Sequence, residues 1–512
     1  MNISRRFFIG GAASFGAFGG CRFFECHDFR AGGTPNLTFG VVSDIHITKI
    51  GADEKMEDWG NNLTFRHALE WFRDQGVDAV VIAGDMADNG MDDHLEAVAQ
   101  AWYAVFPDDR YPDGRPIQKV FAYGNHDFHG FLYGGYAAKR YPDAAECAKH
   151  VLRADLKGWW EKIFHEEYSP FYAKEVKGYP FLVTHWDDGT KMDGGFGTAD
   201  FYGAALGDYL AKSGHKIDPS RPFFYMQHPH LKDTCYGPWA WGHDNGVATK
   251  HLSAYPNAIA FSGHSHYSLT DERSLWQGAF TSVGTSSLRY TGCPYDEFPP
   301  LGYENTWSEG AGASAGRINA AKMMDGFEAG DCRQGMLWRV YDDCIVVRRR
   351  EFLSNLDVGP DWVMPLPTAE SRPFAFAERA KKFRAPEFAD GGKLEVMRTT
   401  LKTRGGADGD KPIESVEKDA FRLTAPAAVP DPSARLYELE FAVEAKGGGR
   451  KTKLVLAEGF NHAPTHKKAT DRSWCGFTVD ELPKGEQVRF SVTPMNCFHA
   501  RGATLVSDWI SV

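Results

Sequence analysis

Residues 37–47 read Leu-Thr-Phe-Gly-Val-Val-Ser-Asp-Ile-His-Ile, an apolar run that ends in two potential metal ligands, Asp44 and His46. A near-continuous series of Leu, Phe and Val is typical of a strand that is buried on both faces of a layered sheet. The two polar side chains then fall in the loop at the carboxyl end of that strand. Open α/β sheets place their binding sites at such ends.

The same combination of apolar run and polar cluster occurs four more times along the chain. The further runs are residues 77–83, 119–123, 223–227 and 258–262. The clusters that follow them are Gly84-Asp85-Met86-Ala87-Asp88, Gly124-Asn125-His126-Asp127, Gln227-His228 and Gly263-His264-Ser265-His266. This pattern predicts an α/β fold with one site assembled from several strand ends.

These clusters combine imidazole, carboxylate and amide groups, the ligand types that bind Zn, Mn, Fe or Mg. They contain no thiolates of the kind found in structural zinc sites. Seven candidate ligands are too many for one ion and enough for two: Asp44, His46, Asp85, Asn125, His228, His264 and His266.

The order D-x-H, G-D-x-x-D, G-N-H-D, a single His and G-H-x-H resembles that of the calcineurin-like metallophosphoesterases. The resemblance covers residues 36–355 and includes all five clusters in order. It implies a four-layer α/β/β/α domain that hydrolyses phosphomonoesters or phosphodiesters. It also implies two divalent or mixed-valence metal ions, with a hydroxide that bridges them as the nucleophile.

Carried over cluster by cluster, the resemblance assigns a ligand set to each metal. One metal would take Asp44, His46 and His266; the other would take Asn125, His228 and His264; Asp85 would bridge the two. Two cations roughly 3.5–4 Å apart can lower the pKa of a bridging water and clamp the phosphoryl oxygens.

Three residues beside the ligands are implied to act in catalysis. His126 would protonate the leaving oxygen, whereas Asp127 and Asp88 would orient imidazoles and hold the loops. Asp88 could equally be a carboxylate that only caps its loop.

Purple acid phosphatases carry a metal-binding Tyr at the position of Asp88, so the sequence does not favour a purple enzyme. The 5′-nucleotidase branch has Glu at the position of Asp127, so a nucleotidase is not favoured either.

Other side chains near the clusters have two interpretations each. His185 and His230 either touch substrate or have no role beyond structure, and Arg289 either holds a phosphate or is solvated at the surface. His243 lies with Trp239 and Trp241 in the aromatic segment 236–246, which could form a substrate rim or a packed loop.

Residues 1–35 are expected to precede the fold. Ser4-Arg5-Arg6-Phe7-Phe8 resembles a twin-arginine export signal, and the uncharged run 7–20 is too short to span a bilayer. The stretch 17–21 resembles a lipoprotein cleavage site with Phe18 in place of the usual Leu, which makes Cys21 a candidate lipid tether. The expected location is the periplasm or the cell surface; a disordered basic tail is the alternative.

The amino-acid composition indicates which binding partners and which cysteine chemistry to expect. A formal net charge of −11 argues against non-specific nucleic-acid binding, so the expected partner is a small-molecule phosphoester. The nine cysteines include no C-x-x-C motif and suggest no thiolate zinc site. Cys332 with Cys344, and Cys475 with Cys497, could pair outside the cytoplasm.

The rest of the chain divides by composition. Residues 131–170 have helical spacing, and residues 336–341 and 344–349 predict a hairpin. The proline-rich segment 356–385 is expected to be an ordered linker. Alternating runs in 386–512 predict a C-terminal β-sandwich of the immunoglobulin or fibronectin type.

An alternative to the enzyme is a non-catalytic surface protein whose metals are structural. Its sandwich would bind a glycan or a protein partner. The complete ligand set and the presence of His126 favour the enzyme.

Overall fold

The computed structural model describes residues 33–48, 55–56, 60–129, 140–186, 200–235, 244–291, 304, 332–403, 406–408, 411–434, 437–457 and 472–512. The predicted export segment, Cys21 included, lies outside these ranges except for its last three residues. None of the helices in the described ranges is long and apolar enough to cross a membrane.

Three of the predicted strand runs form neighbouring parallel strands of one sheet. They are β1 (Leu37–Val42), β2 (Ala79–Ala83) and β3 (Gln118–Ala122). On the other side of β1 lie the antiparallel strands β10 (Gln334–Val340) and β11 (Cys344–Glu351), which form the predicted hairpin. The strand order is β12-β11-β10-β1-β2-β3, and β13 also pairs with β11.

The other two predicted runs lie in a second sheet, as β6 (Phe223–Met226) and β7 (Ala258–Ser262). Its order is β4-β5-β6-β7-β9-β8, and β5, β6, β7 and β9 run parallel. The remaining strands are β4 (Phe171–Val176), β5 (Tyr179–Thr184), β8 (Leu275–Gln277) and β9 (Thr281–Gly284). Every residue of β1, β2, β6 and β7 is buried, which explains the absence of polar alternation in these runs.

The two sheets pack face to face around Phe39 of β1. Its ring centroid lies 4.8 Å from that of Phe224 and 5.3 Å from that of Phe181, both in the second sheet. Trp338 of β10 stacks on the same ring at 5.8 Å. One hydrophobic cluster thus joins the facing sides of the two sheets.

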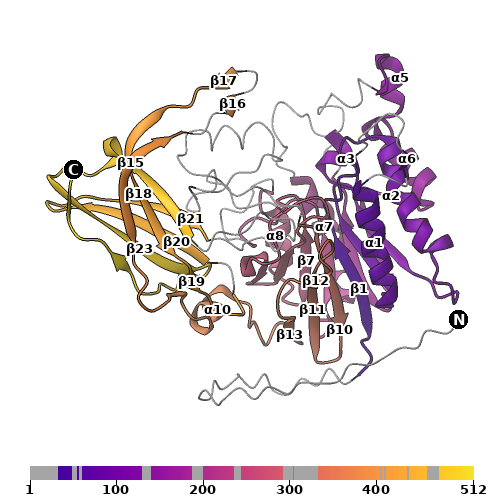
Figure 1. The fold of residues 1–512 in the computed structure, drawn as a ribbon. Helices are drawn as coiled ribbons and strands as arrows, with labels where there is room; N and C mark the ends of the chain where they lie inside the picture. Colours follow the sequence, from indigo (N-terminus) through magenta and orange to yellow (C-terminus); the bar gives the residue numbers. More distant parts are fainter. Residues whose placement is uncertain are drawn as a thin grey trace, which may run out of the picture. The chain divides into compact units, whose positions relative to one another are not determined.

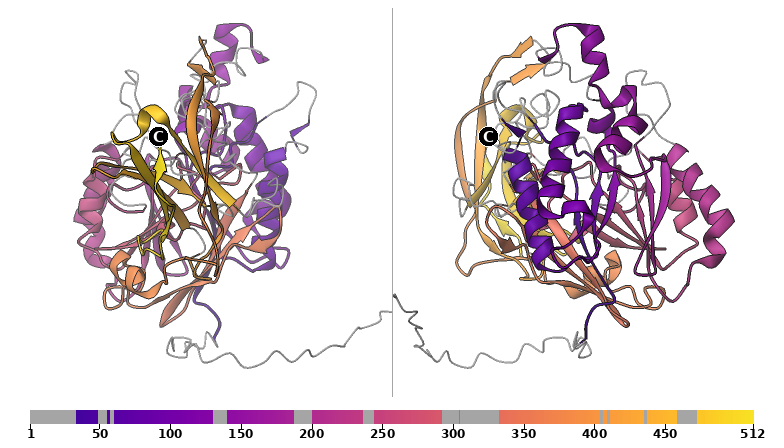
Figure 2. Two further views of the ribbon diagram at one scale, coloured as in Figure 1. Left: turned by 60° about the vertical axis from the view of Figure 1, so that its left-hand side comes forward. Right: turned by 90° about the vertical axis from the view of Figure 1, so that its right-hand side faces the viewer.

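Helices cover the outer face of each sheet, which gives the predicted α/β/β/α order of layers (Figures 1 and 2). The helices on the first sheet are α1 (Gly60–Asp74), α2 (Asp92–Val105) and α6 (Leu156–Phe164). Those on the second sheet are α7 (Asp200–Ser213) and α8 (Val247–Leu252). Helix α1 buries Phe65, Leu69 and Phe72, because these residues recur at helical spacing.

The segment predicted to be helical, 131–170, contains α5 (Ala144–Lys149) and α6; residues 131–139 lie outside the described ranges. Each of these two helices begins after an aspartate whose side chain accepts a hydrogen bond from a backbone N–H in the first turn. Such caps satisfy donors that the helix itself leaves without a partner.

The predicted linker, 356–385, is only partly a connection. It contains β12 (Leu356–Asp357) and β13 (Trp362–Pro365), which pair with β11, and helix α10 (Phe376–Lys382). The prolines obscured β13 in the sequence. Pro365 stands at the end of this edge strand, where the missing N–H is tolerated.

The C-terminal region is built from antiparallel sheets, as predicted. One sheet has the order β21-β20-β23-β24, with β25 on β23, and another has the order β15-β18-β22. The strands are β15 (Glu395–Lys402), β18 (Glu417–Pro426), β20 (Tyr437–Ala445), β21 (Arg450–Leu456), β22 (Arg472–Thr478), β23 (Gln487–Asn496), β24 (Leu505–Val506) and β25 (Ile510–Ser511). Two short pairs are β14 (Glu387–Phe388) with β19 (Ala428–Val429), and β16 (Gly406–Asp408) with β17 (Lys411–Ile413).

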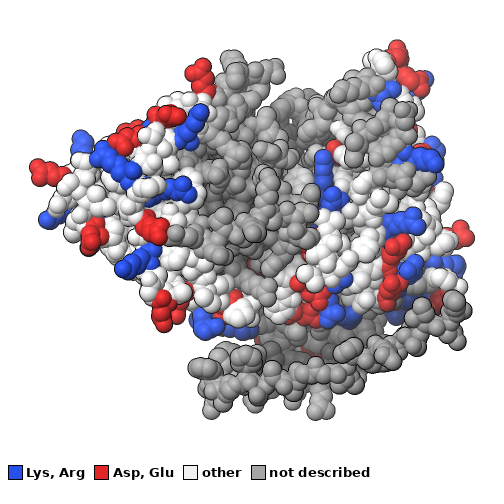
Figure 3. Space-filling model, viewed as in Figure 1, with Lys and Arg blue, Asp and Glu red and all other residues white. Residues whose placement is uncertain are grey.

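A common core joins the two larger C-terminal sheets, with Phe421 and Phe477 from one and Phe441 and Phe490 from the other. Acidic and basic side chains are interspersed on the described surface in Figure 3. Exposed ion pairs such as Arg398–Asp419, at 2.8 Å, accompany this pattern. The interspersed charges avoid a strong field of one sign on this surface.

Neither of the two suggested disulfides forms. All four cysteines are buried, and Cys344, Cys475 and Cys497 are free thiols. Cys475 belongs to the core of the C-terminal sheets, whereas Cys497 packs in a separate cluster with Phe383 and Phe498. The fold therefore keeps apart residues that the sequence order alone allowed to pair.

Buried arginines connect the later elements to the second sheet. Arg349 of β11 donates to Glu272 Oε1 at 2.8 Å, and Trp362 Nε1 of β13 donates to Glu272 Oε2 at 2.9 Å. Arg379 of α10 donates to the backbone carbonyls of Glu272 and Leu275. The segment around Glu272 is thus held by β11, β13 and α10 together.

These contacts predict how the stability of a C-terminally shortened chain depends on the residue at which it ends. A chain ending at residue 353 loses the buried Trp362 and Met364, and each buried large side chain is worth about 1.5–3 kcal/mol. We expect such a chain to unfold at clearly lower urea concentration than one ending at residue 385, which keeps β13 and α10. In the full-length protein, Trp362→Ala should lower the midpoint in the same direction. Equal midpoints for the two shortened chains would show that β13 contributes nothing to stability.

Candidate metal centre

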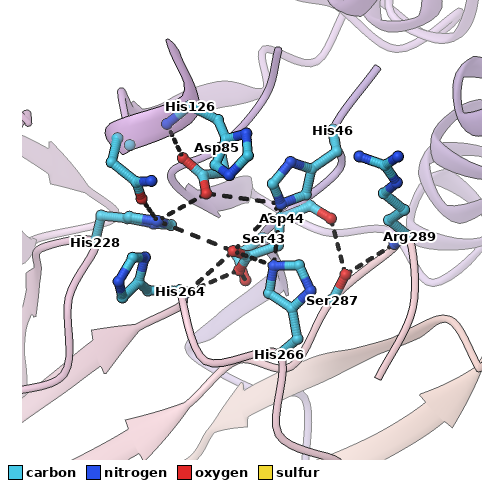
Figure 4. A network of polar contacts seen from close by, with 12 residues as sticks. Ser43, Asp44, His46, Asp85, His126, His228, His264, His266, Ser287 and Arg289 are labelled. Carbon is cyan, nitrogen blue, oxygen red and sulfur yellow. Dashed lines mark hydrogen bonds and ion pairs between the residues drawn. The ribbon is translucent and has the colours of Figure 1, made fainter. Parts of the chain in front are cut away.

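All five polar clusters meet where the carboxyl ends of strands from the two sheets come together. Asp44 and His46 follow β1, Asp85 follows β2, and Asn125 begins the short helix α3 (Asn125–His129) after β3. From the second sheet, His228 follows β6, and His264 and His266 follow β7. Figure 4 shows the side chains of Asp44, Asp85 and four of these histidines turned toward one another.

Backbone hydrogen bonds tie the loops together. The Asp44 N–H donates to Gly84 O at 3.0 Å, the His46 N–H donates to Asp85 O at 3.0 Å, and the Gly263 N–H donates to His228 O at 2.9 Å. These bonds extend the pairing of neighbouring strands into the loops. They place each ligand next to one from a distant part of the sequence.

Five of the seven predicted ligands adopt the left-handed backbone conformation. Their φ angles are 49° at Asp44, 47° at His46, 53° at Asp85, 72° at His264 and 56° at His266. Such angles are uncommon outside glycine, although Asp and His adopt them more often than most residues. A cluster of left-handed residues is typical of sites where the surroundings impose the conformation.

Glycines allow the clusters to approach one another. Gly84 has a φ of 95°, and a Cβ atom on it would clash with the His228 ring. A Cβ atom on Gly263 would clash with the Asp44 carboxylate. These two positions therefore need a residue without a side chain, since a ligand occupies the space where one would lie.

The first ligand group consists of Asp44, His46, Asp85 and His266. His266 Nε2 lies 3.0 Å from Asp44 Oδ1 and 3.0 Å from His46 Nε2. His46 Nε2 lies 3.6 Å from Asp85 Oδ2. The group is almost completely buried, with 0–7% of each of these side chains exposed.

The second group consists of Asp85, His228 and His264, so Asp85 belongs to both. His228 Nε2 lies 3.0 Å from Asp85 Oδ2 and 3.0 Å from Asn125 Oδ1. His228 Nδ1 donates to Ala83 O at 2.7 Å, so in the neutral ring Nε2 carries a lone pair. That lone pair faces two oxygen acceptors, an arrangement that a cation satisfies and that fits the donor set of a metal site.

The pKa values of the clustered Asp and His residues also indicate a site for cations. Burial alone would lower the pKa of His46, but Asp44, Asp88 and Asp85 raise it to about 9. Burial would likewise lower the pKa of His228, and Asp85 and Asp44 raise it to about 9. The pKa values of Asp44 and Asp85 stay below their usual range despite burial, because histidines surround them. The ligand cluster thus favours positive charge, whether as protons or as metal ions.

His126 lies at the more exposed side of the cluster. Its backbone N–H donates to Asp85 Oδ1 at 2.8 Å, and its Nδ1 donates to the Asp88 carbonyl at 2.8 Å. Its side chain is 24% exposed, and its ring centroid lies 4.4 Å from that of His46. Burial and the neighbouring His46 lower the pKa of His126.

Asp127 is buried beneath the site and joins two loops. Its carboxylate accepts hydrogen bonds from the backbone N–H groups of Gly124 at 2.7 Å, Ala87 at 2.6 Å and Met86 at 3.2 Å. Burial and the charge of Asp85 raise the pKa of Asp127 to about 7 in spite of these bonds. These contacts fix the position of the loop that carries Asp85 against the loop that carries Asn125.

Asp88 contacts both a ligand and a cation. Its Oδ1 atom lies 3.2 Å from His46 Nδ1 and accepts an ion-pair hydrogen bond from Arg289 Nη1. A carboxylate on the distal nitrogen of a metal-binding histidine fixes the orientation of the ring. Asp88 therefore does more than cap its own loop.

Comparison with known families agrees with this geometry. The family model of the calcineurin-like phosphoesterases matches residues 37–268. These residues belong to the calcineurin-like metallophosphoesterase family. The matched span includes all five clusters, so the buried Asp and His residues form the candidate dinuclear site of a metallophosphoesterase.

Solved structures that are similar to this chain include two phosphatases and a predicted phosphoesterase. A dimetal phosphatase from Danio rerio has 13% identity over 65% of this chain and 99% of its own, with a TM-score of 0.36. A purple acid phosphatase from yellow lupin (Lupinus luteus) seeds has 11% identity over 64% of this chain and 54% of its own, with a TM-score of 0.36. A predicted phosphoesterase from Streptococcus pneumoniae has 13% identity over 64% of this chain and 97% of its own, with a TM-score of 0.24. The comparison with curated proteins finds no match.

The loop after β9 contributes to the metallophosphoesterase site through Thr285 and Ser287, two residues that were not predicted from the sequence. Ser287 Oγ donates to Asp44 O at 2.9 Å. Ser43 Oγ lies 2.6 Å from Thr285 Oγ1 and also contacts the Asp44 carboxylate. The sequence carries no clear signal for this loop, because residues 281–284 read Thr-Ser-Val-Gly rather than an apolar run, and the Thr-Ser-Ser that follows contains no typical metal ligand.

Two of the remaining candidates, His185 and His230, are buried and contact other residues of the protein. His185 is fully buried among four aromatic rings, 4.6 Å from Trp160, and accepts a hydrogen bond from the Tyr123 N–H at 3.0 Å. His230 lies within hydrogen-bonding distance of Ser265, at 2.6 Å, and Ser265 stands between two ligands. His230 is buried, and its contact with Ser265 lies in the loop that carries His264 and His266. His243, Trp239 and Trp241 lie outside the described residues.

Burial of His185 predicts a pH dependence of stability. Burial lowers its pKa to about 3, whereas a histidine in an unfolded chain titrates near 6.5. Below that pH the unfolded chain binds a proton that the folded chain excludes, so the free energy of unfolding falls by about 1.6 kcal/mol between pH 6.5 and pH 5. Urea denaturation of His185→Gln at these two pH values should show a smaller acid loss than the wild type. The exposed His215→Gln is the control and should match the wild type. An unchanged slope in His185→Gln would mean that His185 is already charged in the folded protein.

Proposed function

We propose that this metallophosphoesterase hydrolyses phosphomonoesters or phosphodiesters, with His126 as the general acid. The observation that carries the proposal is the position of Asp85. Its carboxylate is shared by two groups of ligands and also accepts the backbone N–H of His126. The proposed acid is therefore held directly against the residue assigned to bridge the metals.

The residues present fit two metal ions. Asp44, His46 and His266 would hold one ion, Asn125, His228 and His264 would hold the other, and Asp85 would bridge them. When bound, two such cations supply a water of lowered pKa and positive charge for the phosphoryl oxygens. The nitrogen and oxygen ligands are compatible with Mn, Fe, Zn or Mg.

The protein's own contribution is to orient the acid and to exclude water from the ligands. The bond from His126 Nδ1 to the Asp88 carbonyl sets the ring orientation, so Nε2 is the atom that would give a proton to the leaving oxygen. The ligands themselves are almost fully buried, while His126 is partly exposed. Substrate approaching from the His126 side would meet the acid and the ligand cluster together.

Replacing His126 should separate catalysis from metal binding. A positioned acid contributes about 10²–10⁴-fold to the rate, so His126→Asn should lower kcat by that factor on an alkyl phosphate while both metals stay bound. The loss should be smaller on p-nitrophenyl phosphate, because p-nitrophenolate leaves without protonation. Steady-state kinetics together with metal analysis would test this.

Two further variants make that result interpretable. Asp85→Asn should lose metal as well as activity, since its carboxylate contacts ligands of both groups. The exposed His215→Asn should change neither. Loss of a metal in His126→Asn, or near-normal rates on alkyl esters, would exclude the assigned role.

We also propose that residues 1–35 direct export through the twin-arginine route to the periplasm or cell surface. The proposal is supported by Ser4-Arg5-Arg6-Phe7-Phe8 alone. Changing both Arg5 and Arg6 to Lys should leave the precursor inside the cell, as seen by fractionation and immunoblotting. Normal delivery of the Lys-Lys variant would exclude the twin-arginine route.

Cys21→Ser tests the lipid tether separately, because it should release the exported protein from the membrane fraction.

A further inference from the structure

We infer that Arg289 binds the phosphoryl group directly and makes the site select phosphomonoesters over phosphodiesters. The inference rests on the proposed function, since it assigns the substrate class of that same site. It concerns a residue that belongs to none of the five metal-binding clusters.

The loop after β9 places the Arg289 backbone against the metal-binding loop. The Leu288 N–H donates to Ser43 O at 3.1 Å, and Ser287 Oγ donates to Asp44 O at 2.9 Å. The Arg289 N–H in turn donates to Ser287 Oγ at 2.9 Å. Arg289 is therefore connected to the backbone of Asp44 through a single side chain, as Figure 4 shows.

The Arg289 side chain extends to the same side of the site as His126. Its Nη1 donates to Asp88 Oδ1, the atom that also contacts His46 Nδ1. The backbone carbonyl of Asp88 accepts the bond from His126 Nδ1. Arg289 is 33% exposed and His126 is 24% exposed, whereas the ligands of the first group are 0–7% exposed. The guanidinium thus lies on the accessible side, where a phosphoryl group would enter.

A purely structural role would be to neutralise Asp88. Structural arginines elsewhere in this chain look different. Arg273 is 4% exposed and contacts two acidic side chains, Asp271 and Glu438, and Arg349 is 1% exposed and donates to Glu272 and two backbone carbonyls. Within the described residues, the ion pair of Arg289 is with Asp88 alone. A guanidinium has five N–H donors in a planar fork that matches two oxygens of a phosphate.

Charge and shape together explain the preference for monoesters. A monoester carries three non-bridging oxygens and up to two negative charges, whereas a diester carries two such oxygens and one charge. In a site that already holds one alcohol beside His126, the fork of Arg289 fits the additional non-bridging oxygen of a monoester. A diester would present its second ester group to the guanidinium and gain no charge-assisted bond from it.

The test compares p-nitrophenyl phosphate with bis(p-nitrophenyl) phosphate in the metal-loaded, full-length protein. Arg289→Gln should lower kcat/KM for the monoester roughly 10- to 100-fold, the range expected for a lost charge-assisted hydrogen bond. Its effect on the diester should stay within about threefold. Arg289→Lys, which keeps the charge without the fork, should recover part of the monoester activity. Arg73→Gln, at an exposed position on α1, is the matched control and should leave both rates unchanged.

Several outcomes would overturn the inference. Equal losses on both esters would mean that Arg289 acts only through Asp88, and loss of metal in Arg289→Gln would mean that it only supports the ligand loops. An unchanged monoester rate would exclude contact with the phosphoryl group.

Binding experiments separate this inference from the proposed function. Calorimetry of the metal-loaded protein with orthophosphate and with dimethyl phosphate requires no turnover. Arg289→Gln should weaken orthophosphate at least tenfold and leave dimethyl phosphate unchanged. If the wild type hydrolyses neither ester with any metal, the proposed function fails, and the phosphate titration still decides the role of Arg289.

Discussion

The structure depends on two carboxylates, Asp44 and Asp85, that are removed from water at the meeting point of the two sheets. An isolated buried carboxylate is strongly unfavourable unless opposite charge accompanies it. The surrounding histidines, the loops that carry them and the glycines that let those loops approach all serve this requirement. The metallophosphoesterase fold can therefore be understood as a scaffold that brings cation-binding groups from distant strands to one enclosed point.

Much of this arrangement could be predicted from the sequence because its signals are local. Each buried strand is an uninterrupted apolar run, and each run ends in side chains with distinct chemistry, so Asp44, Asp85 and His228 could be placed at strand ends without any structure. The assignment of particular ligands to particular metals remains a prediction. The structure adds that Asp85 contacts ligands on both sides.

What could not be predicted depends on contacts between distant residues. Ser287 lies more than 200 residues from its partner Asp44, and a serine does not signal such a role by itself. Arg289 could be named from the sequence as a possible phosphate-binding residue, but its ion pair with the distant Asp88 could not. Strand β13 was hidden because prolines normally mark connections, and only pairing with β11 makes the edge position visible. Cys475 and Cys497 do not pair because they pack in separate clusters, which sequence spacing does not reveal.

The left-handed backbone at five ligand positions has a consequence for how the protein trades stability against activity. Each such residue costs on the order of 1–3 kcal/mol relative to a relaxed conformation. Glycine at His264 or Asp44 would relieve that strain while removing a ligand, so the sequence that folds best and the sequence that binds metal best differ at these positions. The backbone at the site thus lowers the free energy of unfolding. The apolar core around Phe39, between the two sheets, offsets this loss.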